Sequence, residues 1–486
     1  MREKYESLSA SVLRELAKSR GIKGTSTMKK AQLVEAMLAL DESEAESKKA
    51  EEAAKPKTAA KAESEKTEKT ERTTSVHHSR GSAEGRREHR SEHHENVRAE
   101  HGEENAEAPV LEEPRDCAGI LEIMQDGFGF IRSDNYLPGD NDVYVAPLQI
   151  RKLNLKTGDI LVGKTRRNNP TDKFGALVHL ETINGFAPEE AAKRKNFEDL
   201  TPIFPNERIR LEQPGSSTAM RIMDLISPIG KGQRGMIVSP PKAGKTTLLK
   251  EVALSVQKTE PDMHLLILLI DERPEEVTDI KEAIEGPNVE VIYSTFDELP
   301  EHHKRVSEML IARAKRLVEH GRDVMILLDS ITRLSRAYNL TVPPSGRTLS
   351  GSLDPAALYN PKRFFGAARK MREGGSLTIL ATALVETGSK MDDVVYEEFK
   401  GTGNMELMLD RKLQEKRVFP AIDIPRSGTR REDLLLNKEE QEATYIIRKA
   451  LNGMKAEEAA DNLINMFSRT KSNAELVQQV IRQKFL

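Results

Sequence analysis

The feature that most limits the fold is a series of apolar segments in the second half of the chain, each followed by a helical pattern. These segments are GMIVS, HLLILLID, VEVIYST, DVMILLDS and SLTILATAL, which begin at residues 235, 264, 289, 323 and 376. Near-continuous Val, Ile and Leu runs are typical of strands buried on both faces, and their alternation with helices indicates a parallel sheet. We therefore expect an α/β domain over residues 228–486.

A phosphate-binding loop follows the first of these strands. The sequence SPPKAGKT occupies residues 239–246, between a strand pattern and a helical pattern at 247–256. In that position, backbone N–H groups and a helix N-terminus face an anion. Ser239 stands where the general motif has its first Gly, and the two prolines lack an N–H, so we expect the cradle to begin at Lys242. The predicted nucleotide-binding residues here are Lys242, Ala243, Gly244, Lys245, Thr246, Thr247 and Arg273.

The expected chemistry is hydrolysis of ATP with Mg²⁺. Lys245 would neutralise charge on the β- and γ-phosphates, and Thr246 would offer its hydroxyl to Mg²⁺. Asp329 and Glu272 each follow an apolar strand, and ligands of parallel sheets bind at the carboxyl ends of strands. Either acid alone would more simply be a cap or a surface charge. Beside the loop, Asp329 is predicted to bind Mg²⁺ and Glu272 to activate the attacking water.

Residues 116–187 show another pattern, in which five short alternating runs are broken by Gly, Asp and Asn. This pattern predicts a small β-barrel. Within GFGFIR, alternation places Phe128, Phe130 and Arg132 on one face of a strand and Ile131 in the interior. Aromatic rings beside a guanidinium form a surface on which bases stack. Tyr144 is predicted to add a third ring.

Phe174, with Asp172 just before it, is predicted to close the same cleft. The alternative is that these aromatic side chains belong to the barrel core. That alternative is stronger for Phe174 than for the ring pair of the GFGFIR segment, because the pair is flanked by glycines in a chain with few aromatics.

Three segments remain. Residues 1–40 carry helical spacing of leucine and valine and predict a small helical domain. Residues 41–115 are rich in Glu, Lys, Ala and Arg, which predicts a disordered charged linker, with extra RNA contacts as the alternative. Residues 188–227 are expected to connect the barrel to the α/β domain.

Composition excludes several other classes of protein. The net charge is −3, so nucleic-acid binding must come from local patches. The single cysteine, Cys117, cannot form an internal disulfide. The apolar runs are far shorter than the ~18 residues that span a bilayer, and the first residues do not resemble a signal peptide. We expect a cytoplasmic protein with no membrane partner.

Long collinear stretches resemble the family of bacterial transcription termination factor Rho. They are LEIMQDGFGFIRS, SPIGKGQRG, PPKAGKT, LLIDERPEEVT, ILLDSITRLSRAYN, PKRFFGAARK, YEEFKGTGNMEL, EKRVFPAID and RSGTRRE. The resemblance runs from about Cys117 to the C-terminus and, more loosely, over the first 40 residues. The Pro-Pro-Lys form of the phosphate loop is that family's own variant.

The resemblance implies an OB-fold, cold-shock-like barrel and a RecA-like ATPase domain in a homohexameric ring. It further implies ATP hydrolysis at subunit interfaces and 5′ to 3′ translocation along nascent, cytosine-rich single-stranded RNA. The expected outcome is unwinding of RNA–DNA hybrid and release of RNA. The RNA polymerase elongation complex and its elongation factors would be the partners.

The resemblance also assigns roles to single residues. The primary RNA site would comprise Phe128, Phe130, Arg132, Tyr144, Asp172 and Phe174, the last standing where the family has Tyr. Two loops would contact RNA in the central pore, namely Asn339–Leu353 with Arg347 and Gly388–Lys400 with Lys390. Lys400, at the end of the second loop, would lie near the pore or near the nucleotide. Arg430 would be an arginine finger that acts on the neighbouring subunit's γ-phosphate, with Arg417 beside it.

Two other functions remain open from the sequence. One is a different hexameric RecA-like ATPase, such as the catalytic subunit of a rotary ATP synthase, although such a subunit has no need of a base-stacking barrel. The other is an RNA-binding protein that no longer hydrolyses ATP. The presence of Lys245, Thr246, Glu272 and Asp329 argues against the second.

Overall fold

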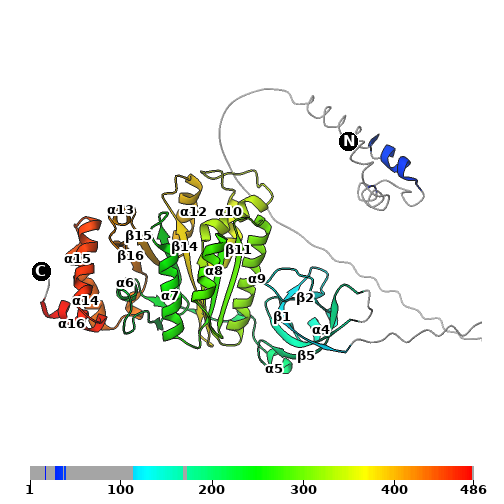
Figure 1. The fold of residues 1–486 in the computed structure, drawn as a ribbon, viewed down its shortest axis with the longest axis horizontal. Coiled ribbons are helices and arrows are strands. Elements are labelled where there is room, and N and C mark those ends of the chain that lie inside the picture. Colours follow the sequence, from blue (N-terminus) through cyan, green and yellow to red (C-terminus); the bar gives the residue numbers. More distant parts are fainter. Residues whose placement is uncertain (1–16, 18–27, 37, 40–112, 168–171, 484–486) are drawn as a thin grey trace, which may run out of the picture. The chain divides into compact units, whose positions relative to one another are not determined.

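The computed structural model describes residues 17, 28–36, 38–39, 113–167 and 172–483 (Figure 1). The chain forms two units, residues 1–101 and 102–486, and each is described by itself. In the first unit, residues 30–36 and 38–39 are helical and Leu33 and Val34 are buried, as the helical spacing predicts. The rest of the predicted helical domain and nearly all of the predicted linker lie outside the described residues.

Five strands close into the predicted barrel, in the order β1-β2-β3-β5-β4. Side chains that alternate along these strands fill its interior, among them Leu121, Ile131, Val145, Leu161 and Ile183. The burial of Ile131 confirms the predicted direction of the β2 side chains. The strands are β1 Arg115–Ile123, β2 Gly129–Arg132, β3 Val143–Val145, β4 Ile160–Arg166 and β5 Gly175–Ile183, with helix α4 at Pro147–Lys152.

The predicted connector is largely part of the α/β domain. Strand β6 (Pro202–Ile203) pairs with β13 (Arg369–Met371), and β7 (Arg208–Ile209) pairs with β8 (Ile229–Gly230). Helix α6 (Thr218–Ile226) is buried on nearly every side in the core of that domain. Most of its side chains are apolar, and its two charged residues are buried with partners: Arg221 donates to the carbonyl oxygens of Phe467 and Thr470 at 2.8 Å, and Asp224 pairs with Arg208 at 2.9 Å. The remaining elements are α5 (Pro188–Ala191) and the 3₁₀ turn η1 (Phe197–Asp199).

The α/β domain is built on a sheet in the order β11-β10-β12-β14-β9-β15-β16. Its strands are β9 Arg234–Ser239, β10 His264–Glu272, β11 Val289–Thr295, β12 Asp323–Asp329, β14 Ser376–Leu384, β15 Met405–Leu409 and β16 Ile422–Thr429. All neighbours along this order are parallel except β15 and β16, which are antiparallel. The predicted parallel sheet is confirmed.

Helices cover both faces of this sheet (Figure 1). Along β10, Leu265, Ile267 and Leu269 belong to one core cluster, whereas Leu266 and Leu268 belong to the other. This explains why the strand is apolar at every position from Leu265 to Ile270. The helices are α7 Lys245–Thr259, α8 Pro274–Ala283, α9 Pro300–Glu319, α10 Ile331–Thr341, α11 Tyr359–Gly366, α12 Lys390–Lys400, α13 Arg411–Glu415, α14 Lys438–Leu451, α15 Ala456–Ser468 and α16 Asn473–Gln483, with 3₁₀ turns η2 Pro355–Leu358 and η3 Glu432–Leu434.

Helix α12 corrects one prediction. We expected Gly388–Lys400 to be a loop, but Lys390–Lys400 is helical and only the two residues before it are not. Val395 and Phe399 lie one turn apart and are buried, so packing stabilises a helix whose polar first turn obscured the pattern. The first three residues of the other predicted loop, Asn339–Leu353, similarly complete α10.

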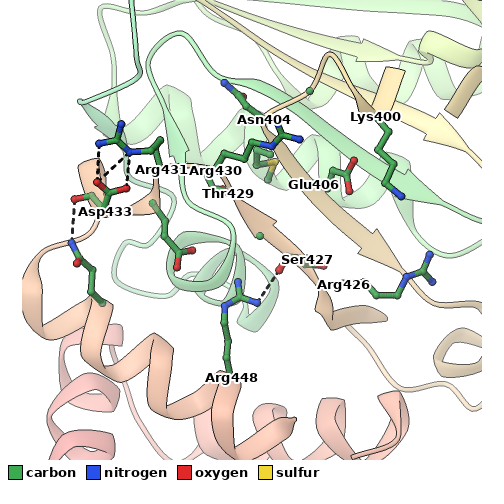
Figure 2. Close-up of a pocket in the computed structure, with 15 residues that line it drawn as sticks. Lys400, Asn404, Glu406, Arg426, Ser427, Thr429, Arg430, Arg431, Asp433 and Arg448 are labelled. Carbon is green, nitrogen blue, oxygen red and sulfur yellow. Dashed lines mark hydrogen bonds and ion pairs between the residues drawn. The ribbon is translucent and has the colours of Figure 1, made fainter. Parts of the chain in front are cut away.

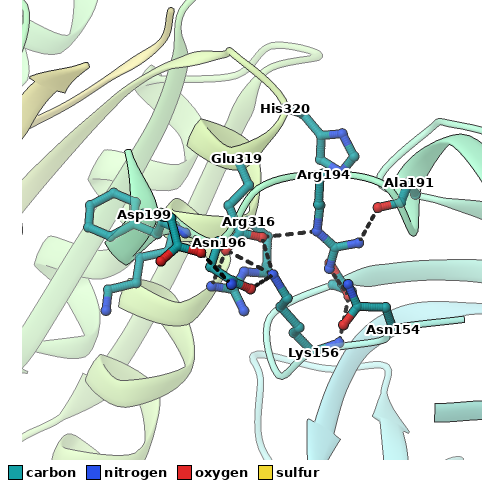
Figure 3. Close-up of polar contacts among 12 residues, drawn as sticks. Asn154, Lys156, Ala191, Arg194, Asn196, Asp199, Arg316, Glu319 and His320 are labelled. Carbon is teal, nitrogen blue, oxygen red and sulfur yellow. Dashed lines mark hydrogen bonds and ion pairs between the residues drawn. The ribbon is translucent and has the colours of Figure 1, made fainter. Parts of the chain in front are cut away.

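Buried ion pairs hold the barrel against the α/β domain (Figure 3). Arg194 donates to Asp159 of the barrel at 2.6 Å and to Glu319 of α9 at 2.9 Å. Glu319 also accepts hydrogen bonds from Lys156 at 3.2 Å and from the backbone N–H of Phe197 at 2.9 Å. Both carboxylates are fully buried, and each has several donors, as buried charges require. In the described part of the chain, no helix is long and apolar enough to cross a membrane.

Candidate nucleotide and RNA sites

The phosphate loop turns sharply between β9 and α7. Lys242 has φ +67° and Gly244 has φ +91°, and α7 begins at Lys245 directly after this glycine. A residue with a Cβ would be strained at Gly244, although no neighbouring atom lies within 4 Å of that position. The open side of the loop faces a cavity of about 730 Å³. Loop N–H groups and the α7 N-terminus therefore border a space large enough for a polyphosphate.

Lys245 lies among the predicted catalytic groups. Its Nζ donates to Glu272 Oε1 at 2.5 Å and to both oxygens of Asp329 at 2.7 Å. Burial alone would lower the pKa of Lys245, but the two carboxylates raise it above its ordinary value, so the ammonium stays charged. Burial and the neighbouring Asp329 raise the pKa of Glu272, which makes this carboxylate a better proton acceptor than a solvated one.

The two predicted magnesium ligands, Thr246 and Asp329, lie next to each other in this cluster. Thr246 Oγ1 is 3.5 Å from Asp329 Oδ2 and 3.4 Å from Glu276 Oε2. Asp329 is fully buried at the end of β12, and Thr382 Oγ1 donates to its Oδ1 at 2.7 Å. A hydroxyl and a carboxylate beside a phosphate site are the donor set that Mg²⁺ takes, since it completes its shell with phosphate oxygens and water.

Two arginines of α10 complete the cavity wall, and sequence reasoning missed both. Arg333 pairs with Asp271 at 2.9 Å and Arg336 pairs with Asp392 at 2.6 Å. Both line the phosphate cavity together with the predicted Arg273, which is exposed. The two arginines are three residues apart, so they lie on the same face of a helix that begins just after Asp329. This spacing could have predicted them as residues of the site.

A second, more apolar cavity of about 400 Å³ borders the other side of the loop. Phe419, half exposed, and Leu409 line it together with Ala243 and Thr247 of the loop and helix α7. A flat apolar slot beside a phosphate cradle suits a nucleotide base. Arg417 is exposed in the turn that leads to Phe419. The sequence offered no signal for this slot because its walls come from segments about 170 residues apart.

Arg430 lies far from the phosphate loop of its own chain. It follows β16, and its N–H donates to Asn404, whose N–H in turn donates to Arg234 at the start of β9. The loop follows the other end of β9 at Ser239, about 17 Å along the strand. Arg430 instead lines a cavity of about 740 Å³ with Lys400, Arg426 and other basic and acidic side chains (Figure 2).

Lys400 therefore lies with Arg430 rather than with the other predicted pore lysine. Lys390 and Lys400 stand at opposite ends of α12, about 15 Å apart. Lys390 and Arg347 are both exposed. Their segments are adjacent, because a Cβ on Gly351 would lie 2.5 Å from the backbone nitrogen of Met391. The structure thus brings together the two segments that carry Arg347 and Lys390.

Four aromatic rings gather on one face of the barrel, and we call them the aromatic platform. The centroid of Phe130 lies 5.7 Å from Phe128, 6.1 Å from Tyr144 and 5.3 Å from Phe174. All four side chains are half-buried, and none belongs to the cluster that fills the barrel interior. Asp172, also half-buried, directly precedes this group. The rings are therefore accessible to a ligand and are not part of the hydrophobic core of the barrel.

Arg132 lies beside the Phe130 ring, on the face of β2 that alternation predicts, but its side chain is buried rather than open to solvent. It is buried and pairs with Glu122 at 2.7 Å and with Asp142. Its guanidinium lies 4.8 Å from the centroid of the Phe130 ring, so it packs against that ring. The two carboxylates pair with the guanidinium and hold it in this position.

Asp142 is a site residue that sequence reasoning missed. It is buried, and one carboxylate oxygen accepts from Arg132 and from the Gly139 N–H. The other oxygen, Oδ1, is buried with no hydrogen-bond partner among the described residues. Through Arg132, this acceptor is connected to the Phe130 ring, and an unpaired carboxylate oxygen suits the exocyclic amine of a base.

Together, the loop, the acids at the strand ends and the aromatic platform define an RNA-binding P-loop ATPase. The sequence matches the RNA-binding domain of Rho termination factor over residues 117–189, the N-terminal domain of the same factor over 4–40, and the nucleotide-binding domain of the ATP synthase alpha/beta family over 219–429. The chain belongs to the transcription termination factor Rho family.

Relatives named transcription termination factor Rho support this membership. The protein from Pseudomonas aeruginosa is 56% identical over 75% of this chain and 88% of its own length. The Bacillus subtilis protein is 55% identical over 74% and 83%, and the Escherichia coli protein is 55% identical over 75% and 87%. Among solved structures, an ATPase of a type III secretion system aligns with 59% of this chain at 20% identity and a TM-score of 0.48.

Proposed function

We propose that this protein terminates transcription as an RNA-dependent ATPase that moves 5′ to 3′ along single-stranded RNA. RNA polymerase would be its target, and unwinding of RNA–DNA hybrid would release the transcript. The observation that carries the proposal is the pairing, in one chain, of an open aromatic platform with a phosphate loop whose Lys245 and Glu272 are 2.5 Å apart.

In the proposed hydrolysis, the loop N–H groups and Lys245 bind the β- and γ-phosphates. Lys245 exchanges its two carboxylate partners for phosphate oxygens, which leaves Glu272 free to accept a proton from water. Thr246 and Asp329 would hold Mg²⁺, which supplies positive charge to the phosphates. The slot beside Phe419 would take the base.

Arg430 would act on the nucleotide of a neighbouring subunit. Its position at the start of β9, about 17 Å along the strand from its own loop, supports action in trans. An arginine supplied from outside stabilises the charge that develops on the transferred phosphoryl group. Lys400, which lines the same cavity, would join it at that interface.

On the barrel, bases would stack on the aromatic platform, and Asp142 Oδ1 would accept a hydrogen bond from an exocyclic amine. Cytosine presents such an amine at N4 and uracil does not, so the arrangement favours cytosine-rich RNA. Arg347 and Lys390, both exposed and carried on adjacent segments of the α/β domain, would bind the phosphate backbone during movement.

The test is ATP hydrolysis measured with no RNA, with oligocytidine and with oligouridine. Strong stimulation that is greater for oligocytidine supports the proposal. Equal hydrolysis in all three would refute RNA dependence and favour a different ring ATPase, and no hydrolysis in any would favour an RNA-binding protein without a motor. A labelled RNA–DNA hybrid with a 5′ RNA tail then reports strand release and its direction.

A further inference from the structure

A single carboxylate, Glu122, joins the aromatic platform to the α/β domain. Glu122 lies on β1 directly opposite Phe130 in the antiparallel pairing with β2. On the barrel side, it accepts from Arg132 Nε at 2.8 Å. On the other side, it accepts from Arg305 Nη2, which is 2.8 Å from Oε1 and 2.6 Å from Oε2. The guanidinium groups of two domains thus share one acid.

On the barrel side, Glu122 is connected to the base-binding surface through Arg132. Arg132 divides its hydrogen bonds between Glu122 and Asp142, and it lies against the Phe130 ring. A base that stacks on Phe130 or donates to Asp142 fixes the position of Arg132. It therefore changes how firmly Glu122 is held and oriented toward Arg305.

On the α/β side, Arg305 belongs to the second turn of α9, and the next residue, Val306, is fully buried in the core beneath the sheet. The segment before α9 is bonded to the end of β10, because the N–H of Phe296 donates to the carbonyl of Glu272 at 3.2 Å. A displacement of the start of α9 would therefore shift the backbone of Glu272.

We propose that Glu122 and Arg305 are positioning residues, through which RNA on the aromatic platform sets the orientation of Glu272 for hydrolysis. This inference rests on the proposed function and adds its route of regulation. Other ion pairs of α9 do not touch the platform: Glu319 bonds to Arg194, and Lys315 bonds to Glu198 at 2.8 Å. Among the described residues of α9, Arg305 is the one whose ion-pair partner, Glu122, also pairs with Arg132 of the platform.

The test uses the full chain with Arg305→Met, which removes the charge but leaves the Arg132–Glu122 pair in the barrel. The matched control is Lys315→Met, which removes another charged partner from the same helix. We expect the RNA dissociation constant and the rate without RNA to stay within about twofold of wild type for both variants. RNA stimulation should fall about fivefold or more in Arg305→Met alone, as a coupling of ordinary size predicts. Arg305→Lys should restore most of it.

A reciprocal measurement separates coupling from a merely structural role. If the two sites are linked, a non-hydrolysable ATP analogue changes the RNA affinity of wild type, and this change is smaller in Arg305→Met. Stimulation equal to that of Lys315→Met would overturn the inference. So would an RNA affinity that falls as much as stimulation does, because Arg305 would then belong to the RNA site. Should Arg305→Met unfold, Arg305→Gln takes its place with the same criteria. Wild type that RNA does not stimulate would refute the proposed function itself.

Discussion

Replacing Phe130 by alanine tests the RNA site most directly. Phe130 is the central ring of the platform, with the rings of Phe128, Tyr144 and Phe174 within 6.1 Å of its own and the Arg132 guanidinium 4.8 Å away. Phe130→Ala removes the ring that touches all the others. If one base stacks on it, the loss is about 1–3 kcal/mol of binding free energy. At about 1.4 kcal/mol for each tenfold change, RNA affinity should fall about 5- to 150-fold.

The same substitution should leave the barrel folded. Full burial of a Phe would make its truncation cost about 3–5 kcal/mol, but this side chain is only half-buried. The interior is filled by other residues, such as Leu121, Ile131 and Leu161. We therefore expect a loss of about 2 kcal/mol in the free energy of unfolding, within what the domain tolerates.

The assay is fluorescence anisotropy of a labelled oligocytidine, paired with thermal unfolding of the same samples. The matched control is Val178→Ala, which truncates another exposed apolar side chain of the barrel, on β5, outside the platform. A folded Phe130→Ala with unchanged RNA affinity would refute base stacking on this ring. Loss of the folded barrel would show instead that Phe130 is core.

The remaining predictions concern the α/β domain. Lys245→Ala should abolish hydrolysis but leave RNA binding at the barrel intact in the anisotropy assay, and hydrolysis at the wild-type rate would refute the loop assignment. Glu272→Gln should still bind ATP without cleaving it. In wild type, the raised pKa of Glu272 should make the hydrolysis rate fall with decreasing pH sooner than for an ordinary carboxylate, because only the ionised form accepts a proton. Mixing inactive Arg430→Ala and Lys245→Ala subunits should restore activity at about one quarter of the interfaces if the arginine acts in trans, and no recovery would contradict that geometry. Burial and Arg194 lower the pKa of His320 to about 4. The stability that its neutral form provides is therefore complete above pH 6.5 and is lost as the pH falls toward 4. Thermal unfolding of His320→Gln should depend less on pH in that range than thermal unfolding of wild type.

The sequence was sufficient for the parts of the fold that local pattern determines. Apolar runs predicted β9, β10, β11, β12 and β14, because a strand buried on both faces must be apolar throughout. The phosphate loop was predictable for a similar reason, since its glycine and lysine act within a few residues of each other. The five strands of the barrel followed from alternation broken by turn residues.

Contacts between distant segments were not predictable in this way. Alternation along β2 correctly placed Arg132 on the face of Phe130, but it could not show that this side chain is buried. Its burial depends on Glu122 of β1 and on Asp142, which directly precedes β3. The slot beside Phe419 likewise needs the phosphate loop as its second wall. Helix α12 is a different case, because the buried Val395 and Phe399 carry a helical spacing that the polar start of the segment concealed.

The position of Arg430 explains why one chain is insufficient for the proposed reaction. Strand β9 carries the phosphate loop at its carboxyl end, while Arg430 is bonded near its amino end through Asn404 and Arg234. Two different surfaces of one subunit must therefore meet those of two neighbours. A contact of this head-to-tail kind repeats until it closes on itself as a ring or continues as a filament. In a ring, each phosphate loop is paired with the Arg430 of a neighbouring subunit. Each nucleotide then lies at a subunit interface, where a movement of one subunit alters the site of the next. The Glu122–Arg305 ion pair would couple the RNA bound to each subunit's barrel to these nucleotide sites.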